Sequence, residues 1–276
     1  MIKFPPCKIN LGLHVINKRS DGFHTIETSF YPIPWCDILE IIPATKTNLF
    51  LTGHAVPGNP YSNIVVKAYQ LLKKDFDLSE VEIHLHKIIP TGAGLGGGSS
   101  DGAIALKILN ELFNLNLPVE KLKHYALQLG SDCPYFLEAT PMMATGRGEE
   151  MYPSPVNLSG LTVLLVKPDV HVSTAEAYSS ITPNTPDQPL KNILQRPIAD
   201  WKIYLKNDFE QSIFKAHPQI EELKNLLYDH GALYASMSGS GSSVYGLFEK
   251  NPELINEIEG LKVWSSLLGN PSIQSA

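Results

Sequence analysis

Hydrophobic and polar residues alternate along several stretches of the first 90 residues, which is the pattern of strands with one buried face. The clearest case is V-E-I-H-L-H-K-I-I at 81–89, where polar residues stand between Val81, Ile83 and Leu85. Asp21-Gly22 is a hairpin-turn signal. Similar patterns predict strands at 7–16, 25–33, 38–42 and 48–52.

Apolar residues recur at helical spacing in other parts of the chain. The series from Ile104 to Leu112 follows Ser99 and Ser100, and either serine can cap its first turn. The run L-T-V-L-L-V at 161–166 predicts a buried strand, and 233–248 predicts two strands around a small-residue loop, with a last element at 261–268. The same criteria predict helices at 64–72, 119–129, 174–180, 190–194, 208–216, 219–230 and 253–258.

The order of these elements favours an α+β fold in two layers over a doubly wound parallel sheet, because strands and helices alternate irregularly and antiparallel hairpins come early. A chain of 276 residues is long enough for one large or two ordinary domains. The stretch 140–158 is rich in proline, glycine and serine, and we place a boundary near Pro155. We therefore expect domains at 1–155 and 156–276.

Charge and cysteine content narrow the classes of function. The net charge is −6 and no more than two Lys or Arg stand in a row, so we expect no nucleic-acid partner. The first residues lack an apolar signal segment and no apolar run approaches membrane-spanning length, so we expect a cytoplasmic protein without a membrane anchor. Cys7, Cys36 and Cys133 are scattered and odd in number, which is typical of reduced thiols.

The segment P-T-G-A-G-L-G-G-G-S-S-D at 90–101 carries the strongest chemical signal. Five glycines stand within the seven residues from Gly92 to Gly98, between a predicted strand and a predicted helix. Glycine is costly to order, so such a run indicates a close approach of the backbone or positive φ angles. The start of a helix has unpaired N–H groups and a partial positive charge, so this loop predicts an anion site, most often for phosphate.

Three known loop types fit the segment poorly. The G-x-G-x-x-G match at 92–97 would need an acidic residue at the end of a second strand, but Glu111 lies inside the helix. A P-loop needs Gly-Lys-Ser/Thr, which this loop does not contain. The G-x-S-x-G match at 98–102 would make Ser100 a hydrolase nucleophile, with Asp132 and His230 as partners, but eight residues separate it from its strand.

The same segment resembles the ATP loop of the kinases named after galactokinase, homoserine kinase, mevalonate kinase and phosphomevalonate kinase, the GHMP kinases. Two further segments, 5–24 and 236–248, follow the order of that superfamily. The first of them, together with L-G-S-D-C-P-Y-F at 129–136, resembles the family of 4-diphosphocytidyl-2-C-methyl-D-erythritol kinases. Cys7 stands where this family usually has Ala, and Phe23 where it commonly has Tyr.

The resemblance implies a two-domain fold, with a mixed sheet in the N-terminal domain and a two-layer α/β sandwich in the C-terminal one. It also implies ATP-dependent phosphorylation of the 2-hydroxyl of a cytidine diphosphate polyol, with Mg²⁺ as cofactor, in the methylerythritol phosphate route to isoprenoids. The expected partners are these two small molecules, and the chain would be a monomer or homodimer. The alternatives are a homoserine- or mevalonate-type kinase, the serine hydrolase, and a ligand sensor without catalysis.

The resemblance assigns the proton acceptor to Asp132 and the cation beside the γ-phosphate to Lys8. The implied ATP-binding residues are Asn63, Lys87, Pro90, Thr91, Gly92, Ala93, Gly94, Leu95, Gly96, Gly97, Gly98, Ser99 and Ser100. The implied acceptor-binding residues are Asn10, Phe23, His24, Phe30, Thr174, Tyr178, Gly239, Ser240 and Gly241. Among these, aromatic rings would stack on cytosine, and His24 would read its edge. The sequence indicates no set of Mg²⁺ ligands.

Overall fold

The computed structural model describes residues 1–253, 258 and 260–269. The chain forms two compact units that are not consecutive in sequence. The first unit consists of Met1–Cys7, Ile33–Thr91 and Gly96–Ala139, and the second of Lys8–Pro32, Gly92–Leu95 and Thr140–Ala276. The chain therefore passes between the units several times, and two of these passages lie within the glycine-rich segment 90–101. The consecutive division at residue 155 stays a prediction.

The first unit contains a mixed sheet with strand order β1-β4-β6-β5. Strands β4 (Ile38–Pro43) and β6 (Val81–Lys87) are antiparallel, whereas β5 (Asn48–Gly53) runs parallel to β6 and β1 (Ile2–Lys3) pairs with β4. Alternate residues of β4 and β6, such as Leu39, Ile41 and Ile83, are fully buried. The predicted alternation over 81–87 is thus confirmed, and Lys87 continues it as a buried residue.

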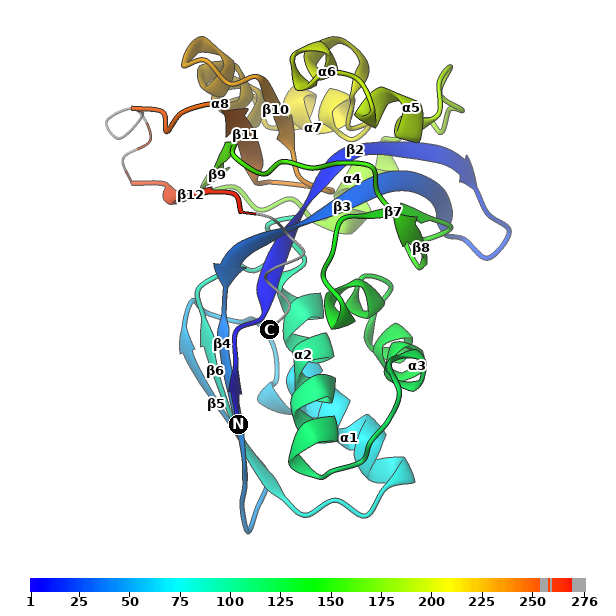
Figure 1. Cartoon of the computed structure of the whole chain (residues 1–276), viewed down its shortest axis with the longest axis vertical. Helices are drawn as coiled ribbons and strands as arrows, with labels where there is room; N and C mark the ends of the chain where they lie inside the picture. Colours follow the sequence, from blue (N-terminus) through cyan, green and yellow to red (C-terminus); the bar gives the residue numbers. More distant parts are fainter. Residues whose placement is uncertain (254–257, 259, 270–276) are drawn as a thin grey trace. The chain divides into compact units, whose positions relative to one another are not determined.

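Helices cover one face of this sheet (Figure 1). Helix α2 (Gly97–Leu112) contacts β4 on one side and helices α1 (Ile64–Asp75) and α3 (Val119–Leu129) on the other. This central position explains why α2 is apolar nearly all round, with Ala103 to Leu106 all buried. Two short 3₁₀ helices, η1 (Pro60–Ser62) and η2 (Cys133–Leu137), precede α1 and follow α3.

The second unit contains two sheets. One has the order β2-β3-β7-β8 and is built on the long strands β2 (Pro6–Lys18) and β3 (His24–Cys36). The hairpin of β7 (Met142–Thr145) and β8 (Glu150–Pro153) extends it, with antiparallel pairing of β3 to β7 and of β7 to β8. This hairpin lies within the stretch 140–158, for which the composition predicted no strand.

The other sheet is antiparallel, with the order β10-β11-β9-β12. Its strands are β9 (Thr162–Lys167), β10 (Tyr234–Met237), β11 (Val244–Phe248) and β12 (Lys262–Leu267). Helices α7 (Glu210–Ala216) and α8 (Pro218–Asp229) pack on it through Ile213, Ile220 and Leu227, which share one core with Leu164 and Val244. The other helices of this unit are α4 (Thr174–Ser179), α5 (Leu190–Leu194) and α6 (Ile198–Tyr204).

The α+β class with a mixed sheet and helices layered on sheets is confirmed. Helices α3 and α5 have the predicted ends, and most other elements agree within a few residues. Helix α6 had no counterpart among the predictions. The predicted helix at 253–258 lies almost entirely outside the described residues.

Candidate active site

A buried ion-pair cluster in the first unit holds both ends of the glycine-rich loop. The Lys87 ammonium group, at the end of β6, lies between the carboxylates of Asp37 and Asp101, with 2.7 Å from Lys87 Nζ to Asp101 Oδ2. Asp37 Oδ1 also accepts hydrogen bonds from the backbone N–H groups of Ile88 (2.6 Å) and Ile89 (2.8 Å). Because Asp101 lies in the first turn of α2, the cluster fixes the strand before the loop and the helix after it.

Burial sets the electrostatics of this cluster. Removal from water raises the pKa of Asp101 to about 8, and although Lys87 opposes this shift, the neighbouring Asp37 adds to it. Burial by itself lowers the pKa of Lys87, but its two carboxylates outweigh that effect and the pKa ends above the usual value. One ammonium group thus serves two carboxyl groups, and the raised pKa favours the protonated form of Asp101.

Helix α2 begins earlier than the sequence predicted. Its N-cap is Gly96, with φ of +70°, and the first helical hydrogen bond runs from Ser100 N to Gly96 O at 2.9 Å. The expectation that Ser99 or Ser100 caps the helix is therefore wrong, because the left-handed turn at Gly96 starts the helix before either serine. In the described part of the chain no side chain caps this turn, so its N–H groups remain available to an anion.

Asp132 precedes η2 in the same unit as the start of α2. Its neighbour Cys133 bonds through its backbone N–H to Gly130 O (3.1 Å), which closes a tight turn after α3. Burial raises the pKa of the Cys133 thiol to about 12, and a hydrogen bond with Ser99 opposes the shift. This contact links the Asp132 turn to the first turn of α2. Asn63 lies elsewhere in this unit, as the cap of α1, and accepts from Val65 N (3.1 Å).

Lys8 and the first half of the glycine-rich loop come together in the second unit. The Lys8 backbone N–H donates to Leu95 O (2.9 Å), and Lys8 Nζ donates to Gly94 O (3.3 Å) and to Asn10 Oδ1. The ammonium group also lies 5.1 Å from the centre of the Phe30 ring. Lys8 is only 4% exposed, and two amide oxygens and an aromatic face are among the groups that contact its ammonium.

A second loop, residues 238–243, packs against this first one. Ser238 Oγ donates to Gly94 O (2.9 Å) and accepts from Asn10 N (3.3 Å). The loops are so close that a Cβ atom at Gly94 would lie 2.1 Å from Ser238 O, so only glycine fits there. One at Gly239 would lie 3.2 Å from Asn10 Oδ1. The small residues therefore serve a close approach between two loops.

The aromatic candidates lie in two separate contacts of the second unit. The rings of His24 and Tyr178 are stacked, with centres 4.8 Å apart and planes 20° from parallel, and Phe209 meets Tyr178 edge-on. Phe23 is 52% exposed, and its ring faces the Arg147 guanidinium at 4.9 Å. Thr174 begins α4, and its hydroxyl lies 3.5 Å from Ser240 Oγ. Of the two neighbouring candidates, His24 is thus stacked on Tyr178, whereas Phe23 lies against an arginine.

Comparison with known proteins agrees with this geometry. The chain matches the GHMP kinases N terminal domain over residues 63–138 and the GHMP kinases C terminal domain over 190–262. A protein of Cytophaga hutchinsonii described as 4-diphosphocytidyl-2-C-methyl-D-erythritol kinase is 50% identical over 93% of this chain and 96% of its own length. One of Bacteroides thetaiotaomicron with the same description is 53% identical over 90% and 92%. The chain belongs to the 4-diphosphocytidyl-2-C-methyl-D-erythritol kinases.

Solved structures agree with this family. A crystal structure described as 4-(cytidine 5'-diphospho)-2C-methyl-D-erythritol kinase has a TM-score of 0.81 and 30% identity, and covers 98% of this chain and 100% of its own. A homoserine kinase from Cytophaga hutchinsonii, with a TM-score of 0.67 and 18% identity over 97% of this chain and 96% of its own, shares the fold. As a member of the family, the chain is an ATP-dependent small-molecule kinase. The hydrolase alternative has no support, because Ser100 is fully buried.

The sequence missed Asp37 as part of this site. Asp37 is 50 residues from Lys87 in the chain, and an isolated acid at the start of a strand carries no local pattern. Among the described helices, none is long and apolar enough to cross a membrane. The described residues also contain no cluster of three or more His, Cys, Asp or Glu side chains that could hold a metal ion.

Proposed function

We propose that the chain transfers the γ-phosphoryl group of ATP to the 2-hydroxyl of 4-diphosphocytidyl-2-C-methyl-D-erythritol, giving the 2-phosphate and ADP. The observation that carries the proposal is the identity of about half of all residues, over more than nine-tenths of the chain, with kinases described by this substrate. The reaction is a step of the methylerythritol phosphate route to isopentenyl diphosphate. The odd number and scattered positions of the cysteines are typical of reduced thiols and favour the cytoplasm as its compartment.

The phosphates of ATP would bind at the glycine-rich loop. The first turn of α2 offers backbone N–H groups and the positive end of the helix dipole, and this helix is long enough for a full dipole. The loop has no lysine of its own, and the Lys87 ammonium is committed to two carboxylates. Any contact of Lys87 with adenosine would therefore use its main chain. Pro90, Thr91 and Asn63 complete the proposed nucleotide site.

Lys8 and Asp132 would carry out the chemistry. Asp132 accepts the proton of the 2-hydroxyl while the hydroxyl oxygen forms a bond to the γ-phosphorus of ATP. The bond from that phosphorus to the oxygen of the β-phosphate breaks, and ADP leaves. The Lys8 ammonium stabilises the negative charge on the γ-phosphoryl oxygens. Support for the lysine comes from its position, because its Nζ donates to the carbonyl of Gly94 inside the glycine-rich loop.

The cytidine part of the acceptor would bind through the aromatic residues of the second unit. Tyr178 supports the His24 ring by stacking, which would orient the imidazole for a hydrogen bond to the cytosine edge. Phe23 is exposed on a turn and offers a face to the base. The polyol end would meet Asn10, Phe30 and Thr174, and the main chain of the loop that contains Gly239, Ser240 and Gly241.

Mg²⁺ would enter with the nucleotide. Mg²⁺ prefers to keep several waters and to use the phosphates of its substrate as ligands, so it needs few protein groups. The Ser100 hydroxyl fits this role in chemistry, since it is a buried oxygen for which the described residues supply no hydrogen-bond partner. When bound, the ion would neutralise charge on the phosphates.

The test is ADP release with a panel of alcohols, each with and without a cytidine diphosphate group. We expect rapid release with 4-diphosphocytidyl-2-C-methyl-D-erythritol, and little with 2-C-methyl-D-erythritol 4-phosphate, homoserine or mevalonate. If homoserine or mevalonate proved the better acceptor by kcat/KM, the proposed substrate would be wrong and the fold class would stand.

A further inference from the structure

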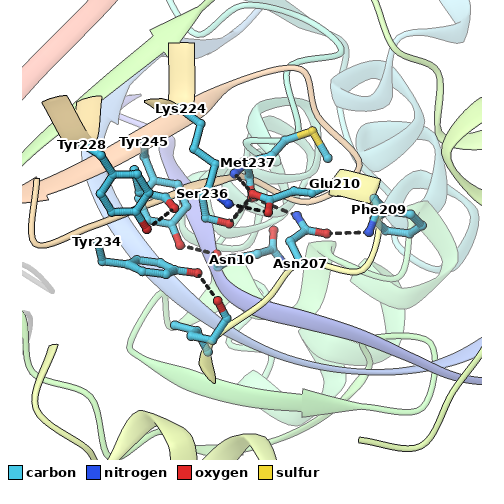
Figure 2. A network of polar contacts seen from close by, with 12 residues as sticks. Asn10, Asn207, Phe209, Glu210, Lys224, Tyr228, Tyr234, Ser236, Met237 and Tyr245 are labelled. Atoms are coloured by element: carbon cyan, nitrogen blue, oxygen red, sulfur yellow. Dashed lines mark hydrogen bonds and ion pairs between the residues drawn. The ribbon is translucent and has the colours of Figure 1, made fainter. Parts of the chain in front are cut away.

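The carboxamide of Asn207 holds the loop of residues 238–243 from behind. Asn207 is 3% exposed, and its Nδ2 donates one hydrogen bond to Met237 O (2.9 Å) and one to Gly239 O (2.8 Å). Its Oδ1 accepts from Phe209 N at 3.1 Å. Figure 2 shows this side chain between the end of β10 and the start of α7. All of its polar groups are thus engaged in the interior.

Only an amide fits this position. Two main-chain carbonyls face the side chain from one direction and an N–H group faces it from the other, so the residue must donate twice and accept once. Aspartate has the same size but no hydrogen to donate. An apolar residue would leave two buried carbonyls and one N–H without partners.

The loop depends on such support because it has no apolar side chains to anchor it. Residues 238–243 are all glycine or serine, and both Gly239 and Gly241 have positive φ angles. Glycine loses the most backbone freedom on ordering, so a loop of this composition is held in one conformation by polar contacts. Of these, the bond from Asn207 is made to the carbonyl of Gly239, a residue with φ of +56°.

The same loop contacts the groups assigned to catalysis. Ser238, next to Gly239, donates to Gly94 O, and that carbonyl also accepts from Lys8 Nζ. A Cβ atom on Gly239 would already lie 3.2 Å from Gly94 O, so the loop cannot shift toward Gly94 without moving it. The path from Asn207 to the Lys8 ammonium therefore runs through Gly239, Ser238 and Gly94, with a contact at each step.

We propose that Asn207 is a positioning residue for the phosphoryl transfer. It fixes the 238–243 loop, and this loop in turn holds the carbonyl of Gly94 that orients the Lys8 ammonium. This inference rests on the proposed role of Lys8. Glu210, three residues on, braces a different part of the same strand, since it accepts from Met237 N (2.8 Å) and from Ser236 Oγ (2.9 Å). Lys224 holds Glu210 in turn, at 2.6 Å (Figure 2).

The test compares Asn207→Ser with Tyr228→Phe in the full chain. Tyr228 OH donates to Ala235 O (3.1 Å), so its loss also removes a side-chain bond to a β10 carbonyl, but away from the loop. We expect kcat of Asn207→Ser to fall by about tenfold to a hundredfold, the scale of a small misplacement of reacting groups. Tyr228→Phe should keep the parental kcat. Each protein is assayed at the same interval below its own Tm, so that differences in stability do not affect the comparison.

A second comparison makes the path itself testable. In a Ser238→Ala background, Asn207→Ser should lower kcat by much less than it does alone, because residues that act through one path are not additive. Equal kcat for Asn207→Ser and Tyr228→Phe would reduce Asn207 to a structural residue and overturn the proposal. If Asn207→Ser does not fold, Asn207→Gln, which keeps the donors on a longer stem, is judged by the same criterion.

These kcat ratios are measured with whichever alcohol the parent chain turns over fastest. If the parent chain does not phosphorylate the cytidine diphosphate polyol, the proposed function alone is contradicted. If the ratio of kcat between Asn207→Ser and the parent stays near one, the role of Asn207 alone is contradicted.

Discussion

Two lysines of this chain are buried to the same extent and differ in the contacts that the structure gives them. Lys87 and Lys8 are each 4% exposed. Lys87 lies between two carboxylates in the first unit, where its charge is cancelled and both ends of the glycine-rich loop are fixed. Lys8, in the second unit, donates to two amide oxygens and lies near the ring of Phe30.

The difference favours Lys87 as a structural lysine and Lys8 as the proposed catalytic one. A buried ammonium that faces carboxylates is stabilised by them and has little attraction left for a phosphate. Lys8 instead donates to Gly94 O, a main-chain carbonyl inside the glycine-rich loop. Both lysines border the same loop and are equally buried, so the contact of Lys8 with the loop and the commitment of Lys87 to two carboxylates support the proposal that Lys8 is the one that acts on ATP.

The largest expected effect is on turnover, from changes to the proposed catalytic pair, Lys8 and Asp132. Lys8→Met keeps the stem and removes the charge, and we expect kcat to fall by about 10²–10³-fold, with weaker ATP binding. Asp132→Asn keeps the size but cannot accept a proton, and kcat should fall by ~10²–10⁴-fold with little change in KM. Steady-state kinetics on both substrates measure these values.

The double variant Lys8→Met/Asp132→Asn should be scarcely slower than the slower single variant, because residues that act as a unit are not additive. A Lys8→Met chain with parental kcat and reduced stability would reverse the comparison and make Lys8 the structural lysine.

The second effect concerns stability. Lys87→Met leaves Asp37 and Asp101 buried without their cation, so the free energy of unfolding should fall by about 3–5 kcal/mol. Urea unfolding monitored by circular dichroism measures it. The variant Lys87→Met/Asp37→Asn is the matched control and should regain part of the loss, because the side chain at position 37 then carries no charge while its Oδ1 can still accept from the N–H groups of Ile88 and Ile89. Parental stability of Lys87→Met would show that the cluster does not hold the loop.

The third effect is on acceptor binding. It shows whether a change at the proposed acceptor site of the second unit alters the KM for the acceptor without altering the KM for ATP. Tyr178→Ala removes the ring stacked on His24, and we expect the KM for the cytidine diphosphate polyol to rise by about tenfold or more, the scale of one aromatic contact to a base. The KM for ATP should stay near the parental value, and Tyr178→Phe should resemble the parent in both. A rise in the KM for ATP alone would remove Tyr178 from the acceptor site.

The smallest effect, taken per pH unit, is a dependence of stability on pH. The folded chain holds a proton on Asp101, whose pKa burial raises to about 8 from the usual 3.8. Between these values the folded state binds more protons than the unfolded state, so this group stabilises the fold at low pH, and that stability is lost as the pH rises toward 8. Asp101→Asn should flatten this decline by up to about 1.4 kcal/mol per pH unit. An identical slope in parent and variant would mean that Asp101 is ionised throughout.

The sequence predicted what depends on neighbouring residues. Alternation located β4 and β6, and helical spacing located both ends of α3. It missed β7 and β8, because Gly146, Gly148 and the nearby prolines resemble a loop while the strands are defined by pairing with β3. The sequence pattern also placed the start of α2 too late, because no local pattern predicts the left-handed turn at Gly96.

The residues of the candidate site also differ in how far the sequence predicts them. The glycine-rich segment could be predicted because the proposed phosphate site is one continuous stretch, whereas the pair Lys8 and Asp132 was assigned by resemblance to a family. The supports of the site join residues far apart in sequence, as in the bonds from Asn207 to Met237 and Gly239. These supporting hydrogen bonds come from common side-chain types without a sequence motif, so they can be identified only when the fold is known.

The most direct test of the central claim is the identity of the product. After reaction of the chain with ATP and 4-diphosphocytidyl-2-C-methyl-D-erythritol, phosphorus NMR should show one new phosphomonoester beside an intact diphosphate. Carbon–phosphorus coupling should place this ester on the quaternary carbon at position 2. Hydrolysis of ATP without a monoester, or a monoester on another hydroxyl, would contradict the account.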